Sequence, residues 1–518
     1  MFSRRLLNAL MLFSVLLSSS LMADWPQAGG PGGDFVIKQN AAINWSMVKD
    51  SNIRWQRTLP ETGQSIPVIA AGKVFVTTLK PVKQDSELGR DIVAYCLSEE
   101  TGKVIWTREI KGKHPLRLSG CFSDSSAPPA VCDGKRVVFT NASGGMTCFD
   151  LDGNIIWEKD YFTVGRTLPF MNNRNLIYTR QVYPPEPNGN FPHSYKDASK
   201  EMWTQLQALD MKTGEIVWTS ECGVNMGNAV IPQTRTDGKR VAVVGRGGGH
   251  GPPEKPEGIS MVDLANGKTL WTLPLVKFMS TQSYGLHGGK VHLFHGGEHL
   301  SVDEVTGEIV KRVSILKDVS VRGRKTDGQG YEDRVEAIKD AGKGRMITQT
   351  SNLLVGPWNY FRSYTLPYLG RVHVEKGTVE YLELPLQVRR GADGESEFLW
   401  HVRPEKKKDP QMKEQVFVPN DMKNSRGLVV FGDKRSKGSG WGHVASAIPS
   451  VAGKHLYVPV MNGTVYVIRW DSETLSEKSV VAFNDLGPVG ESYNRASLSF
   501  ANGSAYAHTI KGVICIGR

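Results

Sequence analysis

Nine polar residues stand in short polar runs directly before apolar segments, where their side chains would gather if those segments lay side by side. They are Asp124, Arg166, Asn228, Glu332, Asp333, Arg334, His443, Asn494 and Arg495. Carboxylates, guanidinium groups, amides and an imidazole can bind a polar ligand through charge-assisted hydrogen bonds, and they can equally bond to one another and to trapped water. The set therefore predicts either a binding site or a polar seal. No catalytic residue is assigned, because no G-x-S-x-G nucleophile elbow accompanies the set.

Four histidines, His287, His292, His295 and His299, lie close together in the chain and suggest a metal site. On a strand, however, alternation sends His292 and His295 to opposite faces, and glycine pairs on either side of this run mark turns. We therefore expect independent, partly exposed histidines and no metal site.

The six cysteines do not form a redox or haem-binding motif. They are Cys96, Cys121, Cys132, Cys148, Cys222 and Cys515, with no C-x-x-C, no C-x-x-C-H and no adjacent pair. Six cysteines allow 15 disulfide connectivities, and the sequence does not choose among them. Four of them lie in apolar runs, which favours buried free thiols.

The elements that must position these groups are visible as a repeat. Gly102, Gly153, Gly214 and Gly267 are each followed four residues later by a tryptophan, and Gly307 is followed at the same spacing by Lys311. Before most of these glycines an apolar segment ends in Asp. An Asp that bonds to turn amides, a Gly with positive φ and a β-branched run together predict a β-hairpin.

A second hairpin precedes each of these, so each unit reads as four antiparallel strands. The predicted units are 64–110, 126–160, 165–221, 227–275, 280–315, 331–388, 443–485 and 495–518. One four-stranded sheet cannot bury both faces alone, and radial stacking of such sheets gives a β-propeller. The prediction is an all-β, eight-bladed propeller whose last blade is completed by an N-terminal strand at Ile53–Arg57. Seven blades is the alternative, because 331–388 matches the repeat poorly.

Insertions interrupt the repeat near residues 79–91, 181–203, 246–258 and 389–440. The glycine-rich run within the third lacks the GKS/T ending of a phosphate loop. The fourth is rich in both Lys/Arg and Asp/Glu, as solvated surfaces are, and nothing in it suggests nucleic-acid binding.

Residues 1–23 are predicted to be a secretory signal peptide. Arg4 and Arg5 precede an apolar run from Leu6 to Leu17, and small residues lead to Ala23. Residues 24–518 then form one propeller domain, exported to the periplasm or the extracellular space, with no membrane span and as a monomer. The composition agrees: 55 Gly among 518 residues suits many tight turns, and the net charge of +11 comes from 63 Lys+Arg against 52 Asp+Glu.

The repeat resembles that of the pyrroloquinoline-quinone (PQQ) type β-propellers, in which the Trp stacks onto the neighbouring blade. The resemblance implies that Trp106, Trp157, Trp218 and Trp271 are docking residues and that Trp55 closes the ring. The run from Asp24 to Asp34, with its Asp-Trp-Pro-Gln start, resembles the opening of exported PQQ-like propellers. The similarity extends over nearly all of residues 24–518.

Two functions are compatible with this resemblance. The first is a non-catalytic binding or assembly module that takes an envelope protein or a small-molecule ligand at the channel mouth. The alternative is a quinoprotein oxidoreductase that uses PQQ with calcium to act on alcohols or sugars. The sequence lacks the adjacent-cysteine pair of the alcohol-oxidising branch and a recognisable Glu/Asn/Asp cation set. These departures favour the binding module, with no cofactor assigned.

Overall fold

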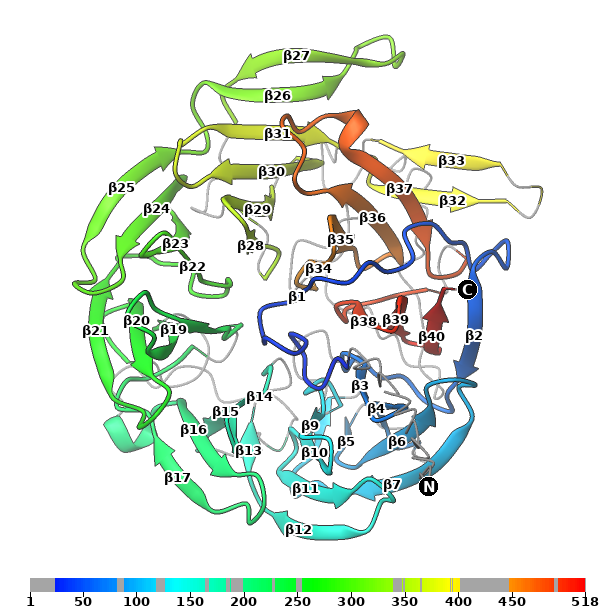
Figure 1. Ribbon diagram of the computed structural model, residues 1–518, viewed down its shortest axis with the longest axis vertical. Helices are drawn as coiled ribbons and strands as arrows, with labels where there is room; N and C mark the ends of the chain where they lie inside the picture. Colours follow the sequence, from blue (N-terminus) through cyan, green and yellow to red (C-terminus); the bar gives the residue numbers. More distant parts are fainter. Residues whose placement is uncertain are drawn as a thin grey trace, which may run out of the picture.

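The computed structural model shows a ring of eight β-sheets around a central axis (Figure 1). It describes residues 24–81, 88–117, 126–163, 167–182, 187, 199–225, 229–247, 254–338, 347, 350–363, 366–391, 393, 395–400, 447–488 and 492–517. Helix in this part of the chain is limited to two single 3₁₀ turns, η1 (Lys200–Met202) and η3 (Glu477–Ser479).

Blades A to D follow one another in the chain, each running from the hub outward. Blade A contains β3 (Val68–Ala70), β4 (Lys73–Leu79), β6 (Ile92–Ser98) and β7 (Val104–Ile110). Blade B contains β9 (Val131–Cys132), β10 (Arg136–Asn141), β11 (Gly145–Asp150) and β12 (Ile155–Lys159). Blade C contains β14 (Phe170–Asn172), β15 (Asn175–Gln181), β16 (Gln205–Asp210) and β17 (Ile216–Thr219), with the short β13 (Phe162–Thr163) also on β15. Blade D contains β18 (Pro232–Thr234), β19 (Arg240–Arg246), β20 (Gly258–Asp263) and β21 (Thr269–Pro274).

Blades E to H complete the ring. Blade E contains β22 (Gly285–His287), β23 (Lys290–His295), β24 (Glu298–Asp303) and β25 (Ile309–Ser314). Blade F contains β28 (Leu353–Val355), β29 (Trp358–Arg362), β30 (Tyr368–His373) and β31 (Val379–Glu383). Blade G contains β34 (Ser450–Ala452), β35 (His455–Pro459), β36 (Thr464–Arg469) and β37 (Val480–Asp485). Blade H contains β38 (Ser499–Ala501), β39 (Ser504–Thr509) and β40 (Gly512–Ile516), and its outer strand is β2 (Ile53–Thr58).

The predicted closure by an N-terminal strand is confirmed, because β2 pairs antiparallel with β40. The predicted number of eight blades is confirmed as well, whereas the predicted boundaries of the sixth unit, 331–388, are wrong. Blade F begins at Leu353, and the chain before it forms the hairpin β26 (Val319–Arg324) and β27 (Tyr331–Glu336). Strand β26 pairs parallel with β31, so this hairpin extends blade F outward (Figure 1).

Two further antiparallel strand pairs lie outside the eight blade sheets. They are β5 (Leu88–Gly89) with β8 (Leu116–Arg117), and β32 (Gln387–Arg390) with β33 (Ser396–Leu399).

Successive blades are joined by the repeat tryptophans, as the resemblance implies. Trp157 of blade B lies against Gly214 of blade C, where an added Cβ would come within 2.9 Å of its ring, and its Nε1 donates to the Met211 carbonyl at 3.1 Å. The same pairing joins Trp55 to Gly102, Trp106 to Gly153, Trp218 to Gly267 and Trp271 to Gly307. Only glycine permits this close approach, because a side chain would occupy the space of the indole.

The Asp of each repeat fixes the turn that carries the docking glycine. Asp150 Oδ1 accepts from the amides of Asp152 at 2.9 Å and Asn154 at 2.8 Å, and Asp303 Oδ1 binds two turn amides in the same way. Bonds from the Asn154 side chain and amide lower the pKa of Asp150. The turn is therefore held by a carboxylate that stays ionised at neutral pH.

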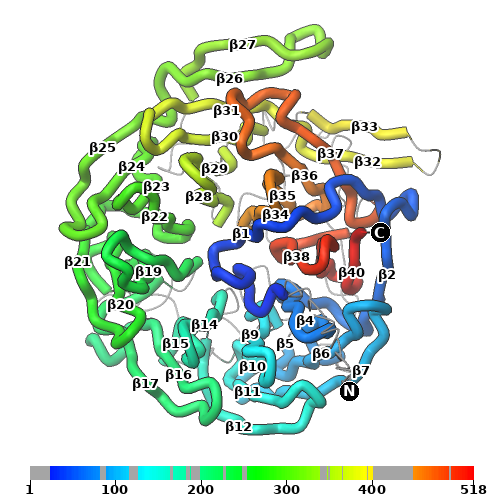
Figure 2. The backbone as a smooth tube through the Cα atoms, in the orientation of Figure 1, coloured from blue at the N-terminus to red at the C-terminus, as the bar shows by residue number. Residues whose placement is uncertain are grey.

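Residues 24–37, here called the N-terminal strap, cross the hub and bind several blades in turn (Figure 2). Trp25 exchanges backbone bonds with Ile69 of blade A, Pro26 accepts from Cys132 of blade B, and Gln27 Oε1 accepts from the Met171 amide of blade C. The strap then reaches blade G, where β1 (Val36–Ile37) pairs parallel with β34. The Trp25 side chain is fully buried.

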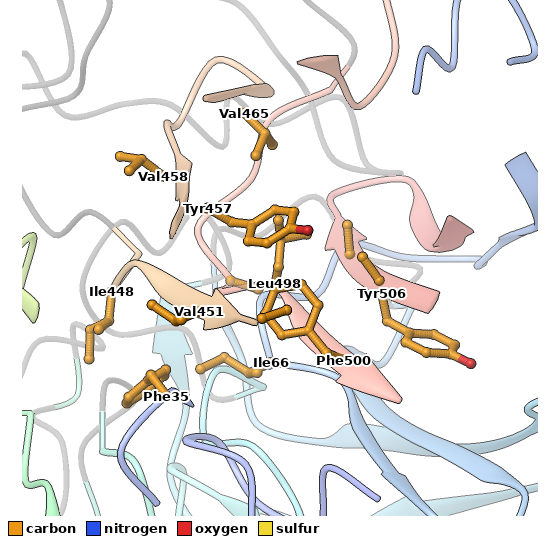
Figure 3. Packing of buried hydrophobic residues seen from close by; sticks show 14 of the residues in the cluster. Phe35, Ile66, Ile448, Val451, Tyr457, Val458, Val465, Leu498, Phe500 and Tyr506 are labelled. Carbon is orange, nitrogen blue, oxygen red and sulfur yellow. The ribbon is translucent and has the colours of Figure 1, made fainter. Parts of the chain in front are cut away.

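The largest apolar cluster forms where the strap, blade A, blade G and blade H meet (Figure 3). Phe35 of the strap lies near Ile448 and Val451, and Tyr457 packs on Phe500 with ring centroids 4.7 Å apart. Burial of this apolar surface ties both ends of the domain to the hub.

Candidate functional site

Two places at the hub could carry a function: the predicted channel mouth, where the inner strands begin, and a cavity at the opposite ends of some inner strands. Of the predicted mouth residues, Asp124, Arg166, Asn228 and His443 lie outside the described residues. Asn494 and Arg495 lie shortly before β38, the inner strand of blade H. Arg495 Nη1 donates to Gln64 Oε1 of blade A at 2.8 Å, and Asn494 is buried against the Ala496 backbone.

The predicted position of Glu332, Asp333 and Arg334 at the mouth is wrong. All three lie in β27, the outermost strand of the six-stranded sheet of blade F. Asp333 is 80% exposed and 3.3 Å from Arg322, and Arg334 pairs with Glu336 at 2.7 Å. The error arose because the first segment of the predicted sixth unit was interpreted as an inner strand. In the structure this segment is part of the outer hairpin β26–β27.

The described side chains along the inner strands mainly join blade to blade. Asn462 Nδ2 of blade G donates to the Leu386 carbonyl beside blade F at 2.9 Å, and Asn172 Nδ2 of blade C donates to the Leu264 carbonyl of blade D at 3.1 Å. His508 Nδ1 lies 2.8 Å from the Ser65 carbonyl, which joins blades H and A. In the described part of the hub, these polar side chains therefore hold neighbouring blades together.

The histidine group is split as the alternation predicts, but two of its members are buried together. His292 and His299 stack with ring centroids 5.3 Å apart, whereas His287 Nε2 lies 3.0 Å from Glu375 at the surface. Burial lowers the pKa of His292 to about 4 and that of His299 well below its ordinary value. Both rings are therefore neutral at physiological pH, and the expected exposure of these two residues is wrong.

The five cysteines that the structure describes, Cys96, Cys132, Cys148, Cys222 and Cys515, are buried free thiols. Burial raises the pKa of Cys96, Cys132 and Cys148 to about 12 and that of Cys222 to about 11. A thiol with such a pKa is a poor nucleophile, so these four residues serve the core.

The described mouth does not fit PQQ with calcium. Calcium takes six to eight oxygen ligands, usually several carboxylates. Within the described ranges no three His, Cys, Asp or Glu side chains gather closely enough to hold a metal ion. Glu254, which lies near the entry to blade D, is held by Arg246 at 3.0 Å and by the Gly223 amide at 2.6 Å. No step through this cofactor is derived.

The second place is a cavity of about 350 Å³, here called the hub pocket. It opens where the strap leaves blade D and passes to blade G. Its walls come from the strap and from the inner strands of blades D, E and F: Gly32, Asp34, Ile231–Thr234, Arg240, Ser283, Gly285–His287, Leu353, Leu354 and Gly356.

Side-chain amides hold the pocket walls in place. Gln233 of blade D donates to the Tyr284 carbonyl of blade E at 2.8 Å and accepts from the Leu286 amide. Asn352 of blade F donates to the Ser283 carbonyl at 2.7 Å and accepts from the Ser283 amide at 2.9 Å. The pocket is therefore preformed between three blades that cannot slide past one another, as small-molecule sites usually are.

The pocket carries both signs of charge. Asp34 keeps contact with solvent, but crowding by the chain raises the pKa of its carboxyl, against the influence of Arg240. Burial lowers the pKa of the Arg240 guanidinium, against the influence of Asp34, although the group stays charged. The Arg240 guanidinium is only partly exposed to solvent, which strengthens its attraction to an anionic ligand, whereas Asp34 is exposed.

Sequence reasoning missed the hub pocket because its residues come from distant segments and the strap has no repeat. Asp34 was visible as the end of the opening motif, and His287 belonged to the histidine group. Only the fold brings them to Arg240.

Comparisons with known proteins agree with the fold. Residues 89–285 match the family model described as outer membrane protein assembly factor BamB. No curated protein sequence matches the chain. Quinohemoprotein alcohol dehydrogenase from Comamonas testosteroni is similar in structure, with a TM-score of 0.51 and 12% identity over 95% of this chain and 80% of that chain. A europium-containing methanol dehydrogenase gives a TM-score of 0.50 and 12% identity over 93% of this chain and 89% of that one. BamB from Moraxella catarrhalis gives a TM-score of 0.35 and 14% identity over 75% of this chain and 93% of that one.

At 12% sequence identity, similarity to these structures shows that the chain has the same fold, but it does not show that the chain has their activity. No helix in the described part of the chain is both long and apolar enough to cross a membrane. The repeat, the tryptophan docking, the eight closed blades and the family match lead to one assignment. The chain is an eight-bladed β-propeller, and its residues 89–285 match a PQQ-repeat family model.

Proposed function

We propose that this propeller is an exported, non-catalytic binding module that holds a small polar ligand in the hub pocket. The hub pocket carries the proposal: it is preformed, and the charged Asp34 and Arg240 line it together with Ile231, Leu353 and Leu354. The buried Asn462 and Asn352 side chains bond to neighbouring blades, and these bonds give the scaffold rigidity. Export rests on residues 1–23, which lie outside the described residues.

The test is a thermal-shift screen of small polar compounds with the purified protein, followed by calorimetric titration of each hit. Leu354 lines the pocket and is only partly buried, so Leu354→Trp fills the cavity from one wall. We expect this variant to bind hits about ten-fold more weakly or worse, because the indole occupies the ligand volume. The matched control is Val276→Trp, which adds the same ring at a residue that is 81% exposed.

Hits that bind wild type and both variants equally would contradict a site in the hub pocket. The oxidoreductase alternative is tested separately by adding PQQ and Ca²⁺ and measuring dye reduction with alcohols and aldoses. Substrate-dependent reduction would overturn the non-catalytic proposal.

A further inference from the structure

The hub pocket offers two opposite charges that the protein does not join to each other. Asp34 comes from the strap and Arg240 from the start of β19, and both line the same cavity. No ion pair of 4.0 Å or less connects these two described residues, although each influences the other electrostatically. A gap between opposite charges can be filled by a ligand that carries both.

Both groups keep hydrogen-bonding capacity for such a ligand. Asp34 Oδ1 accepts from the Val36 amide at 3.2 Å, and within the described ranges no side chain donates to this carboxylate. Arg240 Nη1 donates to Thr234 Oγ1 at 3.0 Å, which leaves most of the five guanidinium N–H donors for a carboxylate. The bond to Thr234 orients the guanidinium group in advance.

The remaining walls limit the size and nature of the ligand. A volume of about 350 Å³ lies near the lower end for small-molecule pockets, so it suits a molecule of few atoms. Ile231, Leu353 and Leu354 supply an apolar surface beside the charges. That surface suits a short apolar side chain.

We propose, as a refinement of the proposed function and dependent on it, that the hub pocket binds a zwitterion of the α-amino acid class. The carboxylate of the ligand binds the Arg240 guanidinium, its ammonium group binds the Asp34 carboxylate, and its side chain lies on Leu353 and Leu354. An internal residue of a peptide presents neither charge, and each peptide terminus presents only one.

The test uses calorimetric titration of the purified protein with L-alanine, L-leucine and L-phenylalanine at concentrations up to about 10 mM, the range of weak single-site binding. Each is compared with its N-acetyl derivative, which lacks the ammonium, and with its amide, which lacks the carboxylate. We expect at least one amino acid to bind, and each of its derivatives to bind about ten-fold more weakly, because a charge-assisted hydrogen bond is lost.

Two charge-neutralising variants test which residue binds the ammonium group of the ligand and which binds its carboxylate. Asp34→Asn should weaken the amino acid about ten-fold without changing the affinity of its N-acetyl derivative. Arg240→Gln should weaken the amino acid similarly without changing the affinity of its amide. Asp152→Asn and Arg174→Gln, at exposed residues of blades B and C, are the matched controls and should leave all affinities unchanged.

The outcomes separate this inference from the proposed function. If hits blocked by Leu354→Trp exist but no amino acid binds, or all three forms bind equally, the zwitterion is wrong and the hub site stands. If no compound shows binding that Leu354→Trp removes, both are overturned.

Discussion

At the scale of single residues, the docking glycines determine how closely blades pack. Gly214 has a φ of +71° and lies against the Trp157 ring, whereas Gly134 has a φ of +82° with nothing within 4 Å of an added Cβ. A side chain at either position would therefore suffer the same strain from the positive φ. Only at Gly214 would it also collide with a tryptophan ring.

We predict that Gly214→Ala destabilises the protein by about 2–4 kcal/mol and Gly134→Ala by about 1 kcal/mol. The difference is the cost of displacing the indole. Guanidinium denaturation, read as the shift in midpoint, measures it. Equal shifts in the two variants would contradict the docking role of the glycine.

At the scale of elements, β2 closes the ring and is held to blade A by Trp55 and by Arg57, whose Nε donates to the Gly102 carbonyl at 2.8 Å. It is an outer strand paired only with β40, and Trp55 joins it to blade A through Gly102 and a bond to the Glu99 carbonyl at 2.9 Å. Trp55 is only partly buried, so its removal loosens the strand without emptying the core.

We predict that Trp55→Ala lowers the opening free energy of β2 by about 1–3 kcal/mol, the scale of a large apolar side chain half removed from water. Hydrogen exchange of the β2 and β40 amides should then accelerate, while β12 of blade B stays protected. Unchanged exchange in β2, or faster exchange in every blade alike, would show that Trp55 does not secure this closure.

The sequence was sufficient for elements that repeat and insufficient for those that do not. The recurring hairpins predicted eight blades, and the family resemblance implied that the tryptophans dock onto neighbouring blades, because the same hairpin recurs with the same chemistry. Blade F was misplaced although a signal existed: Gly377 precedes Tyr381 by the same four residues that separate Gly214 from Trp218. The positions of the strap and the hub pocket could not be predicted from a repeat. They depend on which blades residues 24–37 cross in the folded protein.

At the scale of the whole molecule, buried neutral histidines make stability depend on pH. His508 is fully buried at the joint of blades H and A, and burial lowers its pKa to about 4, as it does for His292. An unfolded chain titrates its histidines near 6.5, so between pH 6.5 and 4 the unfolded state binds more protons than the folded state. Stability is therefore full above pH 6.5 and falls as the pH drops toward 4.

We predict that the denaturation midpoint falls steadily from pH 6.5 to 4 and is flat from 6.5 to 8. His299→Phe, which removes one buried imidazole from the stack, should reduce the slope of that fall. Urea titrations at fixed ionic strength test this. A slope that is identical in wild type and His299→Phe would exclude His299 as a contributor.

The path of the strap has a consequence for the order in which the protein folds. Trp25 finds Ile69 soon after it in the chain, but Phe35 accepts a bond from Val451 and Ala42 donates to Gly503. The strap can therefore bind blades A to C early, but its end at Phe35 and strand β2 can pair only once blades G and H have formed. Contacts of such long sequence separation are slow to form. Blades A to E are made from consecutive segments and can assemble first, so the last event is the pairing of Phe35 and β2 with blades that the end of the chain has just completed.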